Sequence, residues 1–354
     1  MPRIDERNIM FSRITRTEGT KEYDDYYTRN PQNKEFDDSL RAMPPMNGDT
    51  TKFFHPFNSP MVDAAFTFLS DIRGLVEGPP SAEVKVEASP GEFTKKLKGL
   101  AELYGAKLTG VASLDESYYY THRGRTDKVY GEKVEPNLPY TFVFAVETDH
   151  DYINTAPVLS QSIEVTKGYV SAAIVGMILT YYIRLMGYNA RNHMDGNYLM
   201  IMPLAAKAAG LGDIGRHGLL VTPEYGSRIR LGAVSTDMPL ITDEKSKLRI
   251  REFCESCGRC ALLCPSKAIS KEPPEIVEGV ERWQIKQELC FKKWMEFGTD
   301  CGICVASCPF SLPMERSDIE KYIEDPEHRH EMLIKYETME YRKKVNDDKL
   351  NWLK

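Results

Sequence analysis

The cysteines constrain this chain more than any other feature of its sequence. All eight cysteines of the 354 residues lie between positions 254 and 308. They form two runs, C-x2-C-x2-C-x3-C-P and C-x10-C-x2-C-x3-C-P, and each run ends in Cys-Pro. Two copies of one ligand pattern in one short stretch predict a metal-binding unit rather than a set of packing thiols.

The first run has the spacing with which bacterial ferredoxins bind iron–sulfur clusters. In that arrangement three cysteines of a run bind one cluster and the fourth binds the other. Applied here, the rule predicts two 4Fe–4S clusters. The first would be held by Cys254, Cys257, Cys260 and Cys308, and the second by Cys264, Cys290, Cys301 and Cys304.

Zinc and disulfides fit these cysteines less well. Structural zinc sites use tetrahedral ligand sets with a different spacing, and disulfide frameworks are typical of small secreted chains. Cluster assembly needs reduced thiols, which predicts a cytoplasmic protein. The first 40 residues are polar and show no apolar leader or adjacent arginine pair. An exported, membrane-associated form whose leader has been removed is the alternative.

Charge and hydropathy narrow the function classes. The formal net charge is −6 and the isoelectric point is about 5.8, which argues against a general nucleic-acid binder. The longest uncharged run, Gly168 to Ile183, has 16 residues. A membrane-spanning helix needs about 20 apolar residues, so this run predicts a buried core helix and no transmembrane segment.

The rest of the chain predicts an α+β fold with four parts. Residues 1–80 read as a wrapping arm with a short helix over 61–76, 81–247 as a catalytic domain, 248–312 as the two-cluster domain, and 313–354 as a helical tail. In the catalytic domain, Ser89, Pro90 and Glu92 predict a capped helix start. Helices are expected over 163–186 and 198–209, and strands over 107–112, 140–147, 218–222 and 228–235.

A glycine motif at residues 210–215 matches a dinucleotide-binding pattern by letter but not by context. Gly210, Gly212 and Gly215 match G-x-G-x-x-G, the dinucleotide-binding fingerprint. That fingerprint follows a strand and opens a helix, whereas here it follows a helical stretch and leads into a strand. We therefore expect tight turns or a close backbone approach at these glycines, and no nicotinamide or flavin dinucleotide.

The stretch Pro203 to Leu240 (PLAAKAAGLGDIGRHGLLVTPEYGSRIRLGAVSTDMPL), followed by FCESCGRCALLCP, resembles the cobalamin-dependent reductive dehalogenases. Their relatives, the epoxyqueuosine reductases, share the layout. The resemblance covers residues 85–312. It implies a nitroreductase-like α+β domain that binds a corrinoid, fused to a ferredoxin-like domain that supplies electrons to cobalt.

The resemblance also implies the cofactor contacts. No D-x-H-x-x-G motif is present, so a base-off corrinoid is expected, held by backbone and small residues. Gly210, Gly212, Gly215 and His217 would form part of that contact. A purely structural histidine in the turn is the alternative for His217.

Three residues are implied for catalysis. Tyr169, at the start of the core helix, matches the tyrosine that donates the proton in dehalogenases. Arg228 matches the family's arginine, which would stabilise tyrosinate. Asp195 lies where relatives place a polar residue. It is interpreted either as an acid, as in the tRNA-modifying relatives, or as a partner of Arg228.

The function that follows is reductive removal of halide from a small organohalide, with a low-potential ferredoxin, flavodoxin or membrane component as electron donor and a homodimer as a possible assembly. Two alternatives stay open. One is an epoxyqueuosine reductase-like corrinoid enzyme acting on tRNA, against which the acidic composition argues. The other is an electron-transfer protein without catalysis.

Overall fold

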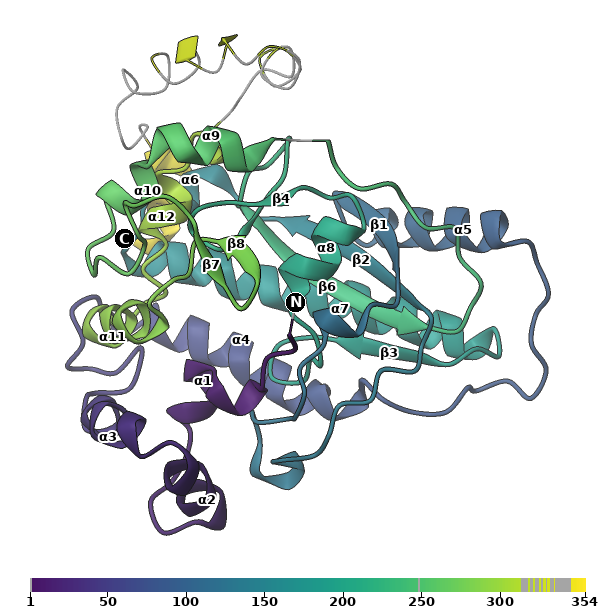
Figure 1. Ribbon diagram of the computed structural model, residues 1–354, viewed down its shortest axis with the longest axis horizontal. Helices are drawn as coiled ribbons and strands as arrows, with labels where there is room; N and C mark the ends of the chain where they lie inside the picture. The colour runs from purple at the N-terminus through teal and green to yellow at the C-terminus, as the bar shows by residue number, and fades with distance from the viewer. Residues whose placement is uncertain are drawn as a thin grey trace.

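A four-stranded antiparallel sheet forms the centre of the computed structural model, which describes residues 2–247, 249–312, a few single positions between 318 and 334, and 345–354. The strand order is β1-β2-β6-β3, with β1 Leu108–Ser113, β2 Tyr140–Glu147, β6 Ile229–Thr236 and β3 Ala190–His193 (Figure 1). Strands from distant parts of the sequence pair directly, since Glu147 on β2 stands opposite Ile229 on β6.

The two faces of the sheet bury different cores because side chains alternate along a strand. On β2, Phe142 and Phe144 belong to a core with the helices on one side, whereas Val143 and Ala145 belong to a core on the other. Gly232 on β6 stands opposite Phe144 and leaves room for its ring. The sheet is therefore covered on both faces.

Helix α7, Leu159–Leu185, runs through the first of these cores. It is long and apolar enough to cross a membrane by length and composition alone, but 56 % of its most apolar window is buried in the protein. It lies between the sheet and α4, Ser59–Ile72. Next to it lies α5, Pro90–Leu103, which begins at the predicted capping box of Ser89 and Glu92. The predicted core helix is confirmed.

The opposite face carries α8, Met202–Ala208, and the small hairpin of β4, Asp213–Ile214, and β5, Leu220–Val221. Gly210 lies two residues after the end of α8, and the next regular element is a strand. The G-x-G-x-x-G stretch thus has the order helix, turn, strand, which is the reverse of a dinucleotide-binding unit.

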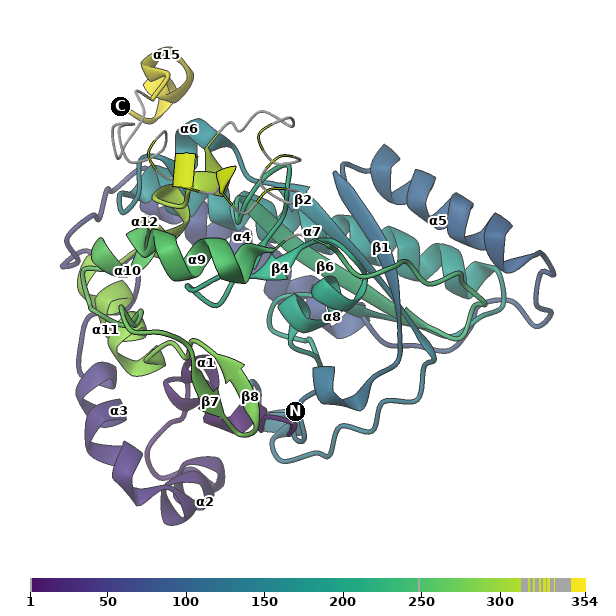
Figure 2. The ribbon, with the colours of Figure 1, turned by 45° about the horizontal axis from the view of Figure 1, so that its top comes forward.

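The cysteines lie on four short helices and on the segments that follow them, and these helices lie at one end of the sheet with α5 at the opposite end (Figure 2). These helices are α9 Ile250–Cys257, α10 Arg259–Leu262, α11 Gln287–Phe297 and α12 Ile303–Ala306, with the ribbon of β7 Glu275–Val277 and β8 Val280–Arg282 between α10 and α11. Left-handed glycines open or close several of them, for instance Gly258 between α9 and α10.

The N-terminal segment carries α1 Met10–Arg13, α2 Lys21–Arg29 and α3 Lys34–Arg41 before α4. Phe11 meets the ring of Phe291 on α11 edge-on, with ring centroids 5.5 Å apart. Phe53 contacts Phe297 in the same way. These contacts agree with an arm held to the rest of the chain by aromatic side chains.

The predicted C-terminal helical tail lies mostly outside the described residues. Its described end forms α15, Asp347–Leu350, and a short 3-10 turn. The mixed helix and sheet content agrees with the predicted α+β class, with β3 and the β7–β8 ribbon as elements that the sequence did not indicate. The exact division into four parts stays a prediction.

Candidate active site

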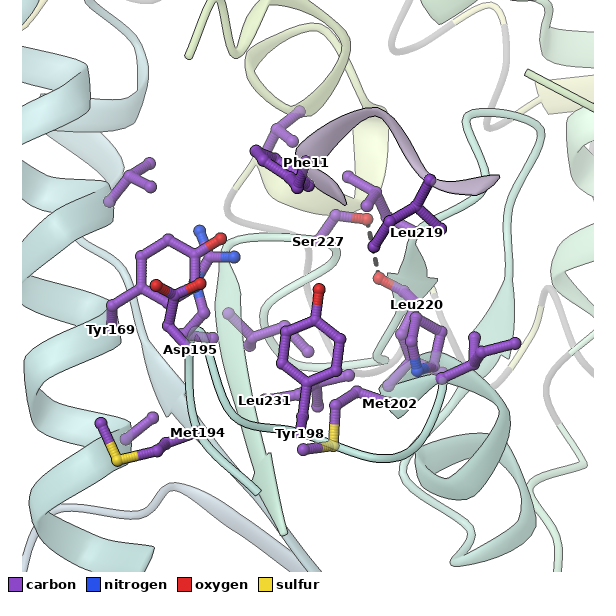
Figure 3. A pocket seen from close by; sticks show the side chains of 18 of the residues that line it. Phe11, Tyr169, Met194, Asp195, Tyr198, Met202, Leu219, Leu220, Ser227 and Leu231 are labelled. Atoms are coloured by element: carbon purple, nitrogen blue, oxygen red, sulfur yellow. Dashed lines mark hydrogen bonds between the residues drawn. The ribbon is translucent and has the colours of Figure 1, made fainter. Parts of the chain in front are cut away.

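A cavity of about 540 Å³ lies where the sheet, the N-terminal segment and the cysteine helices meet. Its wall takes Phe11 from the N-terminal segment, Tyr169 from α7, Asp195 from the turn after β3, and Cys290 and Trp294 from α11. Figure 3 shows Tyr169 from α7, and Asp195 and Tyr198 from the segment between β3 and α8, pointing into this space. Most of the remaining lining is aliphatic or methionine.

Tyr169 lies beneath an arginine. The Cζ atom of Arg230 is 3.8 Å from the centroid of the Tyr169 ring. Gly168 makes this approach possible, because a Cβ atom there would lie 3.3 Å from the Cβ of Arg230 and 3.1 Å from Thr148. Burial raises the pKa of Tyr169 to about 12, while Arg230 acts in the opposite direction. The phenol therefore keeps its proton at neutral pH, next to a cation that favours the phenolate.

Asp195 belongs to a second charged group on the same wall. Its carboxylate lies 3.8 Å from the guanidinium of Arg125. Arg125 also donates a hydrogen bond of 3.0 Å to the hydroxyl of Tyr198. Burial alone would lower the pKa of Arg125, but Tyr198 and Asp195 raise it above its ordinary value. Arg125 therefore stays charged and fixes the orientation of two polar side chains at the cavity.

Two polar atoms of the lining are buried without a hydrogen-bond partner among the described residues, Oε1 of Gln161 and Nε of Arg230. Buried polar atoms are normally paired. Gln161 is 2 % exposed and lies against Gly302, where a Cβ atom would be 2.6 Å from its amide nitrogen. Unpaired groups of this kind fit a cavity that receives a large polar-edged molecule.

His193 is the histidine among the residues that line the cavity. Its Nδ1 accepts a hydrogen bond from the backbone N–H of Leu199, and its Nε2 lies 2.8 Å from the hydroxyl oxygen of Ser235. Burial, with Arg191 beside it, holds the pKa of His193 well below its ordinary range. Both ring nitrogens are engaged inside the protein, so this wall offers no free imidazole as a metal ligand.

Four of the eight cysteines, those predicted to hold the first cluster, gather around one small cavity. Cys308 is electrostatically coupled to Cys254, Cys257 and Cys260, and these four thiols line one small cavity. The thiol of Cys304 is influenced most by Cys301, then by Cys260 of the first group, and then by Cys290 and Cys264. Burial raises the pKa of Cys260 to about 12 and that of Cys290 to about 11. Buried thiols of this kind are compatible with a bound metal cluster, whose cations would compensate the thiolate charge.

The two groups differ in their place relative to the large cavity. Cys290 of the second group lines it, whereas the small cavity of the first group is lined by Arg216, His217 and Phe310. Asp300, next to Cys301, lies near Arg230. Burial raises the pKa of Asp300 to about 6, Arg230 lowers it, and Asp195 raises it. The second group therefore adjoins the residues around Tyr169.

Comparison with known proteins agrees with this arrangement. Residues 253–312 match the family described as 4Fe-4S dicluster domain. A tetrachloroethene reductive dehalogenase from Desulfitobacterium hafniense is 33 % identical over 270 residues, which cover 63 % of this chain and 49 % of that protein. The enzyme of the same name from Sulfurospirillum multivorans is 32 % identical over 273 residues, 67 % of this chain and 53 % of that protein. The chain is a homologue of the reductive dehalogenases.

A solved reductive dehalogenase, whose structure was interpreted in terms of B12-dependent dehalogenation, has the same fold. It superposes with a TM-score of 0.74 at 23 % identity, over 99 % of this chain and 46 % of that one. The chain thus spans about half the length of the reductive dehalogenases that it matches.

With this relation in place, the predicted reductive dehalogenase residues can be located. Tyr169 and Asp195 line the large cavity. Arg228 does not reach Tyr169: its guanidinium donates to the carbonyl oxygens of Ser311 and Thr148, at 2.6 and 2.7 Å, and to Glu147 at 3.2 Å. The expected pairing of Asp195 with Arg228 is likewise replaced by Asp195 with Arg125.

The residues of the turn after α8 that were predicted to contact the corrinoid are not among those that line the large cavity. A Cβ atom on Gly210 would meet the carbonyl oxygen of Glu244 at 2.2 Å, and one on Gly212 that of Val221 at 2.1 Å. Gly215 packs against Val221 and His217. His217 accepts from Leu219 and lies 3.2 Å from the Ser227 hydroxyl. These residues serve close packing of the chain against itself, and the large cavity is lined by the following Leu219 and Leu220 (Figure 3).

Sequence reasoning missed Arg125, Gln161, Tyr198 and Arg230. Arg230 had a usable signal, because residues two apart on a strand share a face and Arg228 was already a candidate. Arg125 sits in a loop without periodicity, so its position at the cavity depends on the tertiary fold alone.

Proposed function

We propose that this chain is a corrinoid-dependent reductive dehalogenase, which replaces a halogen of a small organohalide by hydrogen. The overall change consumes two electrons and one proton and releases halide. The observation that carries the proposal is the protonated Tyr169 under Arg230, in a cavity whose wall also contains Cys290 of the second cysteine group. A proton donor and a predicted cluster ligand thus line the same cavity.

The residues present fit a base-off corrinoid. The cavity is lined chiefly by aliphatic and methionine side chains, and it contains the unpaired polar atoms of Gln161 and Arg230. Both nitrogens of His193 are engaged, which is consistent with a corrinoid that takes no histidine from this wall. When bound, a corrinoid supplies a cobalt centre that gives up electrons at low potential to a carbon–halogen bond. The solved relative described in terms of B12-dependent dehalogenation supports this cofactor.

Tyr169 would supply the proton from its Oη atom. Because its pKa is about 12, the phenol is fully protonated at neutral pH. The guanidinium of Arg230 over the ring stabilises the phenolate that forms when the proton leaves, and reprotonation from water restores the phenol. A general acid of this kind contributes about 10²–10⁴-fold to a rate.

Arg125, Asp195 and Tyr198 would shape the space beside the donor. Arg125 keeps the Tyr198 hydroxyl and the Asp195 carboxylate in place. Phe11 and Trp294 give an apolar wall, which suits an uncharged organohalide such as the substrate named for the tetrachloroethene relatives. The electron donor would deliver low-potential electrons to the cysteine groups, and the second group is the one at the cavity.

The test uses the full chain, purified without oxygen and reconstituted with iron, sulfide and cobalamin. We expect about eight irons per chain, because two clusters of four irons are predicted. We also expect one bound cobalt per chain. With a titanium(III) reductant it should release chloride from tetrachloroethene or bromide from a brominated phenol. Full iron with no retained cobalt would contradict the proposal and favour an electron-transfer protein. Bound cobalt without halide release, together with tRNA binding that weakens with salt, would favour the epoxyqueuosine reductase-like alternative.

A further inference from the structure

Arg216 stands out among the buried charges because no carboxylate neutralises it. The side chain is 3 % exposed. Every hydrogen bond that it donates ends on a backbone carbonyl oxygen. Within the described residues no Asp or Glu oxygen lies within ion-pair distance of its guanidinium. A buried cation without an anion is costly, so a negative group is expected close by.

The carbonyl groups that Arg216 contacts all surround the first cysteine group. The guanidinium donates to the carbonyl of Cys254 at 2.9 Å and more weakly to that of Glu255 at 3.4 Å. Both belong to the last turn of α9, whose carbonyls have no partner within the helix. It also donates to Ser270 at 2.9 Å and to Glu272 at 3.0 Å. One side chain thus joins the last turn of α9 to residues 270–272, and Cys257 and Cys260 of the first group lie between these two segments.

Arg216 also borders the place where a cluster would sit. It lines the small cavity formed by Cys254, Cys257, Cys260 and Cys308. Its charge acts on the thiols of Cys254 and Cys260. Its outer face is closed by the ring of Trp283, 4.5 Å from Cζ to the centroid. Trp283 in turn donates to the Glu272 carbonyl at 2.9 Å, so the cation is held between a stacked ring and the cysteines.

We propose that Arg216 is a positioning residue that also sets the potential of the first cluster. Its backbone contacts hold the cysteine loop, and its unneutralised charge stabilises the more negative, reduced form of a 4Fe–4S cluster bound there. Cluster potentials depend on local charge and hydrogen bonding. The inference depends on the two clusters and not on dehalogenation, so it can fail or hold independently of the proposed function.

The second cysteine group has no equivalent unpaired arginine in the described part of the chain. The cation that acts on Cys301 is Lys293, whose ammonium is paired with Glu296. A paired, surface-lying lysine has a weak net effect on its surroundings. Lys293→Gln is therefore a matched control, because it removes a positive charge near the second cluster instead of the first.

The experiment is an anaerobic reductive titration of the iron-loaded full chain, followed by electron paramagnetic resonance, for the wild type, Arg216→Gln, Arg216→Lys and Lys293→Gln. Arg216→Gln should weaken electron uptake by one cluster about tenfold, equivalent to about 59 mV for one electron. Arg216→Lys keeps the charge and should shift it much less. Lys293→Gln should leave that cluster unchanged. A Cys257→Ser variant identifies the affected signal as that of the first group.

Iron counts make every outcome decisive. A full complement with no shift in Arg216→Gln would overturn the inference. Loss of half the iron in Arg216→Gln but not in Arg216→Lys would support it, because lysine keeps the positive charge that glutamine removes. Loss of half the iron in both variants would overturn the charge effect, since the carbonyl contacts would then be all that Arg216 contributes.

Discussion

The guanidinium of Arg230 lies on the ring of Tyr169, with Cζ 3.8 Å from the centroid. The two residues come from different layers of the fold, Arg230 from β6 and Tyr169 from α7. They meet because Gly168 presents no side chain to the strand. The pair places a cation on the electron-rich face of a phenol, which is the arrangement that eases loss of its proton without removing that proton at rest.

Tyr169→Phe should slow halide release at least about 100-fold, because the proton donor is lost while the ring and its packing remain. The effect should fall on kcat with little change in KM. Steady-state chloride release from cobalamin-loaded protein measures it. Tyr182→Phe, on the same helix and packed against the core, is the control and should keep full activity. Retention of more than about a tenth of the rate by Tyr169→Phe would exclude its role as the main donor.

The pH profile should carry no titration of Tyr169 in the ordinary range. Burial raises its pKa to about 12, so the proton is present below that value and is lost only above it. The rate should therefore show no alkaline fall due to this group up to about pH 10, where a free tyrosine is half ionised. A decrease in rate centred at about pH 8 that disappears in Tyr169→Phe would show that the phenol is far more acidic than its buried surroundings imply.

Arg230→Met should slow the reaction about tenfold or more. Removing the cation raises the pKa of Tyr169 further, and one pKa unit is worth about 1.4 kcal/mol. Arg228→Met is the matched comparison, because Arg228 binds Ser311, Thr148 and Glu147 instead. We expect that variant to lose stability but to keep its turnover per iron-loaded molecule. Slow turnover in Arg228→Met with normal turnover in Arg230→Met would show that Arg228, and not Arg230, assists Tyr169.

The sequence predicted the parts of this protein that depend on local chemistry. The cysteine spacing predicted a two-cluster unit that the family match supports, the Ser89 capping box predicted the start of α5, and the apolar run after Gly168 predicted α7. The strand predicted over residues 140–147 agrees with β2 to the residue. Each of these signals acts over a few residues, which is why a single sequence carries it.

What the sequence missed depends on contacts between distant segments. Strand β3 has only four residues, is buried throughout and shows no alternation. Arg125 reaches the cavity from an irregular loop, and Arg230 replaced Arg228 because the sheet ladder ends at Ile229. The Arg228 side chain instead donates to the carbonyl oxygen of Ser311, which follows the last cysteine. No periodicity records where a ladder stops.

Two glycine substitutions should have opposite effects on stability. A Cβ atom on Gly232 would lie 2.4 Å from the Phe144 ring, so Gly232→Ala overfills a packed core and should cost about 1–3 kcal/mol. Gly99 lies within α5 with nothing within 4 Å of its would-be Cβ, so Gly99→Ala should add about 0.5–1 kcal/mol. Urea unfolding of iron-loaded protein compares them. Equal effects of the two changes would mean that Phe144 yields to the new methyl group.

Arg13 should be the residue on which attachment of the N-terminal segment depends most. Its guanidinium binds Asp37 at 2.7 Å and Glu288 on α11 at 2.6 Å, and the Asp37 side chain is fully buried. Arg13→Met leaves that carboxylate without its cation, and breaking a buried pair costs about 3–5 kcal/mol. The Tyr27 hydroxyl still donates to Asp37, which places the expected loss at the lower end of that range. The double variant Arg13→Met with Asp37→Leu should recover part of the stability, because no charge is then left buried. Lys34→Ala, which removes an exposed partner of Asp38, should leave unfolding unchanged. Limited proteolysis would show whether the N-terminal segment itself loosens. Cleavage before residue 59 should be faster in Arg13→Met than in the wild type, and it should return toward the wild-type rate in the double variant. Equal cleavage rates in all these proteins would show that the aromatic contacts of Phe11 and Phe53 with α11 hold the segment without the ion pair.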